Sequence, residues 1–77
     1  MEELKNLYDK FCSNEYDILD VIGILPYMDI PNEMLEAVKN AEEQIDYLRF
    51  MVTGREQEER VKKILKELMK KAKKCKK

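Results

Sequence analysis

Histidine and tryptophan are absent from the 77-residue sequence, and glycine, proline and cysteine occur only twice each. Histidine is the commonest general base at neutral pH and the commonest protein ligand for metal ions. The sequence also lacks a glycine-rich phosphate loop and cysteine pairs at the spacing of zinc sites. We therefore expect no enzymatic activity, no metal centre and no cofactor.

The few cysteines and apolar runs also bear on location. Cys12 and Cys75 lie far apart with no second pair, so we expect free thiols rather than a disulfide framework. No apolar segment of signal-peptide length follows the acidic first residues. The longest nearly apolar stretch, residues 21–28, is interrupted by Gly23 and Pro26 and is too short to cross a bilayer. We therefore expect a cytoplasmic protein that does not enter a membrane.

The length and composition of the chain predict one small helical domain, residues 1–77. A chain of this size has room for a single core, and Glu, Lys, Leu and Met dominate while Gly and Pro are rare. The predicted fold class is therefore all-α. Because one small core gives modest stability, self-association into a homo-oligomer is a further expectation.

The first predicted helix covers about residues 2–25. Its apolar residues recur at helical steps of three and four, with Asn14 as the one polar member. Ser13 and Asn14 favour caps over helix interiors, so a break near 13–14, with either residue capping a second helix, is the alternative. The constant phase of the stripe favours the unbroken helix. The stripe consists of Leu4, Leu7, Phe11, Ile18, Val21 and Leu25.

The second and third predicted helices cover about residues 31–52 and 54–73, and residues 73–77 form a predicted frayed basic tail. Continuing the second stripe past Val52 would place charged residues in the core, so the chain must turn, and we expect the turn at Thr53 and Gly54. Thr53 and Glu56 have the spacing of a capping box. The two stripes are Met34, Val38, Ala41, Ile45, Leu48 and Val52, and Val61, Ile64, Leu65, Leu68 and Ala72.

Short connections make consecutive helices antiparallel neighbours. The predicted architecture is therefore a three-helix, up-down-up antiparallel bundle. We expect Tyr8, Tyr47 and Cys12, which lie beside the stripes, at the margin of the core.

Charge is distributed unevenly along the chain. Residues 1–50 hold twelve acidic and four basic side chains, whereas residues 51–77 hold eleven basic and four acidic ones. The acidic half could imitate a nucleic-acid backbone, which is a minor hypothesis. Its carboxylates could also form a divalent-metal site, although a solvated helix face explains them more simply. Those carboxylates are Glu15, Asp17, Asp20, Glu42, Glu43 and Asp46.

Five lysines of the third helix recur every three or four residues and form one cationic stripe: Lys63, Lys66, Lys70, Lys73 and Lys77. Such a stripe could contact a phosphate backbone without sequence specificity. The simpler interpretation is a solvated face stabilised by acid-base pairs four residues apart and by the helix dipole. Those pairs are Glu56 with Arg60, Glu58 with Lys62, Glu59 with Lys63, and Glu67 with Lys71.

The connector between the first two predicted helices is unusually apolar, with Tyr27, Met28 and Ile30. These residues could contact a partner, with Phe50 and Met51 as a second patch, or could close the end of the bundle. The leading hypothesis is a non-enzymatic helical interaction module, a small regulator, adaptor or inhibitor that docks a helical face or this connector on a protein partner. The main alternative is a nucleic-acid-binding accessory protein that uses the lysine stripe.

Overall fold

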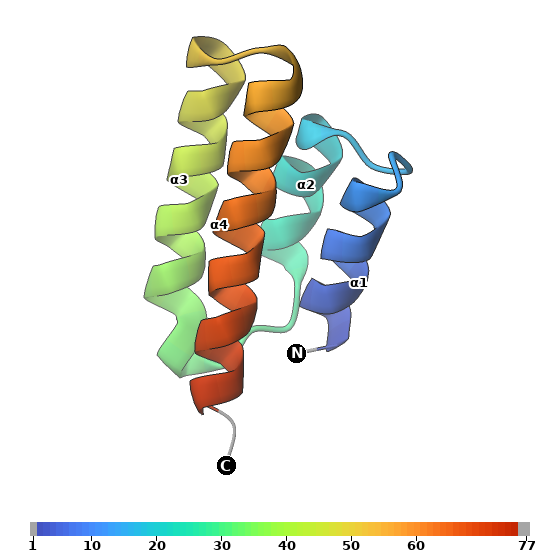
Figure 1. Ribbon diagram of the computed structural model, residues 1–77. Helices are drawn as coiled ribbons and strands as arrows, with labels where there is room; N and C mark the ends of the chain where they lie inside the picture. Colours follow the sequence, from blue (N-terminus) through green and yellow to red (C-terminus); the bar gives the residue numbers. More distant parts are fainter. Residues whose placement is uncertain (1, 76–77) are drawn as a thin grey trace.

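A computed structural model describes residues 2–75 of the chain and the side chains of residues 3–73. This part of the chain contains helices and no strand, which confirms the predicted all-α class (Figure 1). The α-helices are α1 (Glu2–Cys12), α2 (Ile18–Ile24), α3 (Leu35–Met51) and α4 (Gly54–Cys75). Two 3₁₀ turns, η1 (Leu25–Tyr27) and η2 (Asn32–Met34), lie between α2 and α3.

The four α-helices alternate in direction and form an up-down-up-down bundle (Figure 1). Each helix contacts two neighbours: α1 packs beside α2 and α4, and α3 packs beside α2 and α4. The long helices α3 and α4 form one side of the bundle, and the shorter α1 and α2 form the other. No helix within residues 2–75 is long and apolar enough to cross a membrane.

The prediction of an unbroken first helix over residues 2–25 is wrong, and the bundle has four helices instead of three. The chain leaves α1 at Cys12 because Asn14 adopts a left-handed conformation with a φ of 69°. The Glu15 amide donates to the Lys10 carbonyl at 2.9 Å, and the Asn14 amide donates to the Phe11 carbonyl at 3.2 Å. These two bonds form a Schellman motif, which ends α1.

Helix α2 begins with its own cap, at Asp17, and not at Ser13 or Asn14. The Asp17 carboxylate accepts from the Asp20 amide at 3.0 Å, and the Asp20 carboxylate accepts from the Asp17 amide at 3.1 Å. This reciprocal pair satisfies two backbone donors that a helix start leaves free. Helices α1 and α2 each turn an apolar stripe toward the core, so the two stripes can share one phase although the chain folds back between them.

The second predicted helix is close to the observed one. Its first turn is η2, in which the Met34 amide donates to the Pro31 carbonyl at 2.9 Å, and the α-helix begins at Leu35. It ends at Met51, and Val52 has the extended backbone of a C-cap.

The predicted turn between the last two helices is confirmed. Gly54 has a φ of 71°, in the region that favours glycine. The Gln57 side-chain amide donates to the Val52 carbonyl at 2.8 Å and to the Leu48 carbonyl at 3.4 Å, which joins the start of α4 to the end of α3. Among the described residues no hydrogen bond joins Thr53 to Glu56, so the expected capping box is not formed. Helix α4 continues to Cys75, and residues 76 and 77 of the predicted tail lie outside the described range.

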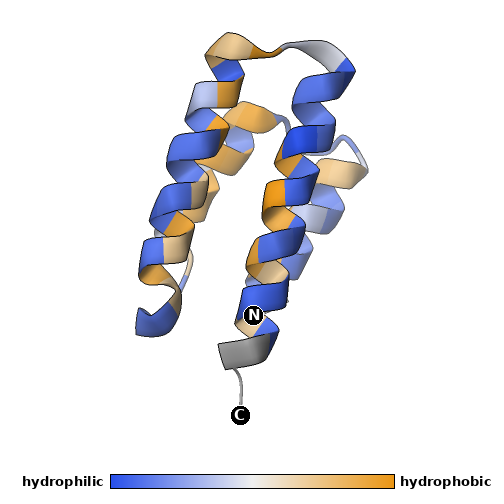
Figure 2. Cartoon of the chain, turned by 60° about the vertical axis from the view of Figure 1, so that its left-hand side comes forward, coloured by the Kyte–Doolittle hydropathy of each residue, from blue (hydrophilic) through white to orange (hydrophobic). Residues whose placement is uncertain are grey.

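One apolar cluster lies between the four helices and contains no buried polar or charged residue among those described. Hydrophilic residues cover the outside of the helices (Figure 2). Almost every member of the predicted stripes is in the cluster or packs against it, since each helix presents its apolar side to the centre. The buried residues are Leu4, Leu7, Phe11, Val21, Leu25, Met28, Met34, Val38, Ala41, Ile45, Leu48, Val61, Leu65, Leu68 and Ala72.

Candidate functional site

The connector contributes less exposed apolar surface than its sequence indicates. Met28 is buried, and Ile30 is half-buried against the core. Tyr27 is 89% exposed and is the one predicted contact residue of this segment that faces solvent. Met28 and Ile30 therefore close the end of the bundle, and the predicted connector surface is reduced to a single aromatic side chain.

A larger exposed apolar surface lies on the last turns of α3. Tyr47, Phe50 and Met51 are 61%, 70% and 62% exposed, and their spacing of three and four residues brings them together on the helix. We call these three residues the aromatic patch. Phe50 and Met51 were predicted as contact residues. Tyr47 was expected at the core margin, and that expectation is wrong.

The aromatic patch arises because the last turns of α3 carry apolar residues outside the core stripe as well as within it. Ile45 and Leu48 are buried in the core, while the patch residues, beside the Asp46–Arg49 ion pair, lie where the described chain leaves them exposed. The Arg49 guanidinium lies 4.5 Å from the centre of the Phe50 ring, a cation-π contact that leaves most of the ring exposed. The patch is therefore an apolar surface without a structural role inside the described part of this chain.

A groove of about 880 Å³ begins at Tyr47, the one member of the aromatic patch that lines it, and follows the seam between α3 and α4 on the outside of the bundle. Gln44 and Tyr47 line one side of it, and Arg60 and Ile64 line the other. A second hollow, with Ala37 and Lys71 among its residues, shares Gln44 and Ile64 with the first and extends the groove along both helices. We call this side of the α3-α4 pair the outer face.

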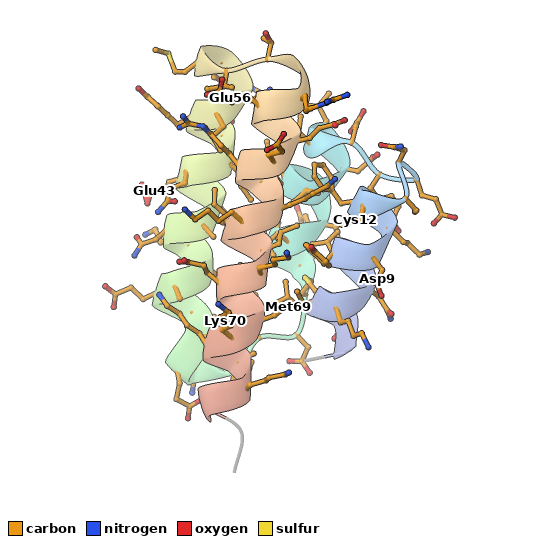
Figure 3. All side chains as sticks on the ribbon, viewed as in Figure 1. Asp9, Cys12, Glu43, Glu56, Met69 and Lys70 are labelled. Atoms are coloured by element: carbon orange, nitrogen blue, oxygen red, sulfur yellow. The ribbon has the colours of Figure 1, made fainter. Side chains whose placement is uncertain are left out.

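The two sides of the groove carry charges of opposite sign. Glu43 lies on the α3 side, and Arg60 and Lys63 lie on the α4 side. Among the described residues no ion pair joins α3 to α4. One ion pair lies within α3, Asp46 with Arg49 at 3.6 Å, and the other lies within α4, Glu56 with Arg60 at 2.9 Å. Figure 3 labels Glu43 on α3 and Lys70 on α4. The charges of Glu43 and Lys63 remain available to groups outside the molecule.

The lysine stripe lies on the surface of α4. Lys63, Lys66, Lys70 and Lys73 are all exposed, and Lys77 lies outside the described residues. Of the four predicted acid-base pairs, Glu56 with Arg60 is formed, and the other three are not within ion-pair distance in the described chain. Internal pairing therefore accounts for little of the positive charge on this face.

The acidic residues considered for a metal site do not gather in one place. Asp17 and Asp20 cap α2, whereas Glu42, Glu43 and Asp46 lie on α3. Within the described part of the chain, no three cysteine or carboxylate side chains lie close enough together to hold a metal ion.

The remaining titratable feature is on α1, away from the groove. Burial raises the pKa of the Tyr8 phenol above its ordinary value of 10.0, and a hydrogen bond with Cys12 adds to the rise. Tyr8 is half-buried against the core, as expected for a margin residue, whereas Cys12 is exposed, so the same expectation is wrong for Cys12. The phenol is neutral at physiological pH with or without this rise, so the pair does not change the charge of α1 there.

Among the described residues, the outer face of α3 and α4 thus combines exposed apolar side chains, a groove, and charges that have no ion-pair partner. Comparisons of the chain with protein-family models, with curated proteins and with solved structures found no match.

Proposed function

We propose that this chain is a non-enzymatic interaction module that docks the outer face of α3 and α4 onto a protein partner. The observation that carries the proposal is the aromatic patch, where three large apolar side chains are each more than 60% exposed. Aromatic residues and methionine are enriched in protein interfaces, because aromatic rings bury much apolar area at low entropic cost and methionine adapts its shape to irregular surfaces. A small regulator, adaptor or inhibitor would use such a surface.

The helical face is a better docking surface than the connector. Tyr27 is a lone exposed aromatic residue whose neighbours Met28 and Ile30 are committed to the core. The aromatic patch instead adjoins a groove that has apolar atoms at its floor and charges along its sides. An apolar centre with a polar rim is the usual anatomy of a protein interface.

The test replaces one exposed tyrosine at a time with a photoreactive phenylalanine analogue in the cell that makes this protein. Substitution at Tyr47 places the reactive group in the proposed surface, and substitution at Tyr27 is the matched control on another exposed tyrosine. We expect discrete protein adducts from position 47 after illumination and few from position 27, measured by mass spectrometry. The proposed docking face would be contradicted if position 47 formed no adducts, or if position 27 formed as many adducts as position 47.

A second function is favoured by the lysine stripe, whose exposed lysines have few acidic partners within the chain. A nucleic-acid-binding accessory protein could contact phosphates with Lys63, Lys66, Lys70 and Lys73. Its affinity for random duplex DNA should fall steeply with salt, because each phosphate contact releases a counterion.

The two functions are distinguishable because Lys66 and Lys73 do not line the groove. Substitution of both by Glu should abolish duplex binding and leave the photoreactive adducts at position 47 unchanged. Absence of duplex binding by the unmodified chain at low salt would exclude the second function.

A further inference from the structure

We propose that the partner of the outer face is a second copy of this chain, related by a two-fold axis that runs parallel to α3 and α4. This inference rests on the proposed docking face and names its occupant. The resulting dimer is a four-helix arrangement in which α3 of each copy packs on α4 of the other.

The antiparallel arrangement of α3 and α4 determines what each symmetry axis would bring together. A two-fold axis parallel to the helices places α3 of one copy opposite α4 of the other. The rotation does not change the position of any residue along the direction of the helices. Residues that line the same part of the groove therefore come to face one another between the copies. Helix α3 also remains antiparallel to the α4 that it meets.

The charges of the groove are complementary under this axis. Glu43 lies eight residues before the end of α3 and Lys63 nine residues after the start of α4, so the antiparallel helices place both at about the same level. In the dimer, Glu43 of each copy faces Lys63 of the other, so the contact forms twice. These two residues have no ion-pair partner across the groove of their own chain, which leaves both free for the second copy.

The apolar surface of the groove follows the same pattern. Tyr47 lies four residues before the end of α3 and Arg60 six residues after the start of α4, so the two are at about the same level, and Ile64 lies about one helical turn farther along α4. In the dimer, each Tyr47 ring is placed against the Arg60 guanidinium and the half-buried Ile64 side chain of the other copy. This contact removes apolar surface from water and adds a cation-π interaction on each side of the axis.

The other face-to-face orientation is unfavourable. A two-fold axis perpendicular to the helices would place α3 against α3 and α4 against α4. The α4 side carries Arg60, Lys63 and Lys71 along the groove, with Glu67 as the one acid, so it would meet its own positive charge. Like charges at an interface oppose association.

The test measures the dissociation constant of the full chain by sedimentation equilibrium, with two charge-reversal variants. Glu43→Lys alone sets lysine against Lys63, and Lys63→Glu alone sets glutamate against Glu43, so each variant by itself should dimerise about tenfold more weakly or worse. In an equimolar mixture, the two variants restore both opposite-charge contacts. We expect the mixture to form heterodimers with nearly the affinity of the unmodified chain.

Lys5→Glu is the matched control, because Lys5 is an exposed charge on α1 at a distance from the groove. It should leave the dissociation constant unchanged, and circular dichroism should show the same helicity in all variants. A strictly monomeric unmodified chain at high concentration, or a mixture that associates no better than its components, would overturn the proposal. If position 47 then still forms adducts with a different protein, the docking face stands and only its occupant is wrong.

Discussion

At the scale of single residues, the two glycines differ in backbone conformation, although both have open space beside them. Gly54 adopts a φ of 71° in the turn before α4, whereas Gly23 lies in the helical conformation of α2. A Cβ atom at either position would meet nothing within 4 Å. Backbone conformation alone therefore decides the effect of a side chain at each position.

Alanine substitutions should separate the two glycines by the sign of their effect. Gly54→Ala should lower the free energy of unfolding by about 1 kcal/mol, because a left-handed backbone is unfavourable for residues with a Cβ atom. Gly23→Ala should raise it by about 0.5–1 kcal/mol, because alanine favours a helix more than glycine does. Urea denaturation measures both, and a loss of stability on Gly23→Ala would show a contact that the structure does not contain.

Gln57 is the second residue on which the α3-α4 turn depends, because its amide satisfies carbonyls of Leu48 and Val52. Gln57→Glu keeps the shape of the side chain and removes both donors. We expect a loss of about 1–2 kcal/mol at neutral pH, where the carboxylate meets carbonyl oxygens. The loss should shrink below about pH 4, where a protonated carboxyl can donate again. Denaturation series at two pH values provide the measurement, and unchanged stability at neutral pH would contradict this role.

At the scale of elements, the hairpin of α1 and α2 is the part that the sequence predicted least well. The signals were local: Asn14 in a left-handed conformation, and the spacing of Asp17 and Asp20 before Ile18. The prediction weighed the phase of the apolar stripe more heavily than these cap residues. Phase cannot distinguish one long helix from two helices that fold back, because both bury the same residues.

The hairpin can be tested at Asn14 by the sign of one substitution. In an unbroken helix, Asn14→Ala would stabilise the protein, because alanine favours helix interiors. At a φ of 69°, the same change should instead lower the free energy of unfolding by about 1 kcal/mol, and Asn14→Gly should be nearly neutral. Thermal unfolding of both variants distinguishes the two folds, and stabilisation by Asn14→Ala would contradict the break.

The hairpin of α3 and α4 was predictable because its phase changes at the turn. A phase change cannot be accommodated in one straight helix, so the turn was correctly predicted at Thr53 and Gly54, with α3 ending at Met51 and α4 beginning at Gly54. The exposed positions were harder to predict. Tyr47 lies beside the apolar stripe in the sequence, and only the packing of α2 and α4 shows that no neighbouring helix covers it. Met28 was the opposite case, since its burial depends on how the connector folds under the bundle.

At the scale of the whole molecule, the uneven distribution of charge along the sequence places basic and acidic helices next to each other. Helix α4 contains most of the basic residues, and it packs between the more acidic α1 and α3. The described chain forms no ion pairs across these seams, so the charged side chains of neighbouring helices are not paired with one another. Such a surface is complementary to itself once a two-fold axis exchanges its halves.

The most direct test of the central claim, that the outer face of α3 and α4 binds a second copy of this chain, is a dilution series followed by amide chemical shifts. We expect concentration-dependent shifts for residues that line the groove, with Gln44, Tyr47, Lys63 and Ile64 among the largest, and constant shifts along α1. Shifts that do not change with concentration, or that change along α1 and the connector instead, would contradict it.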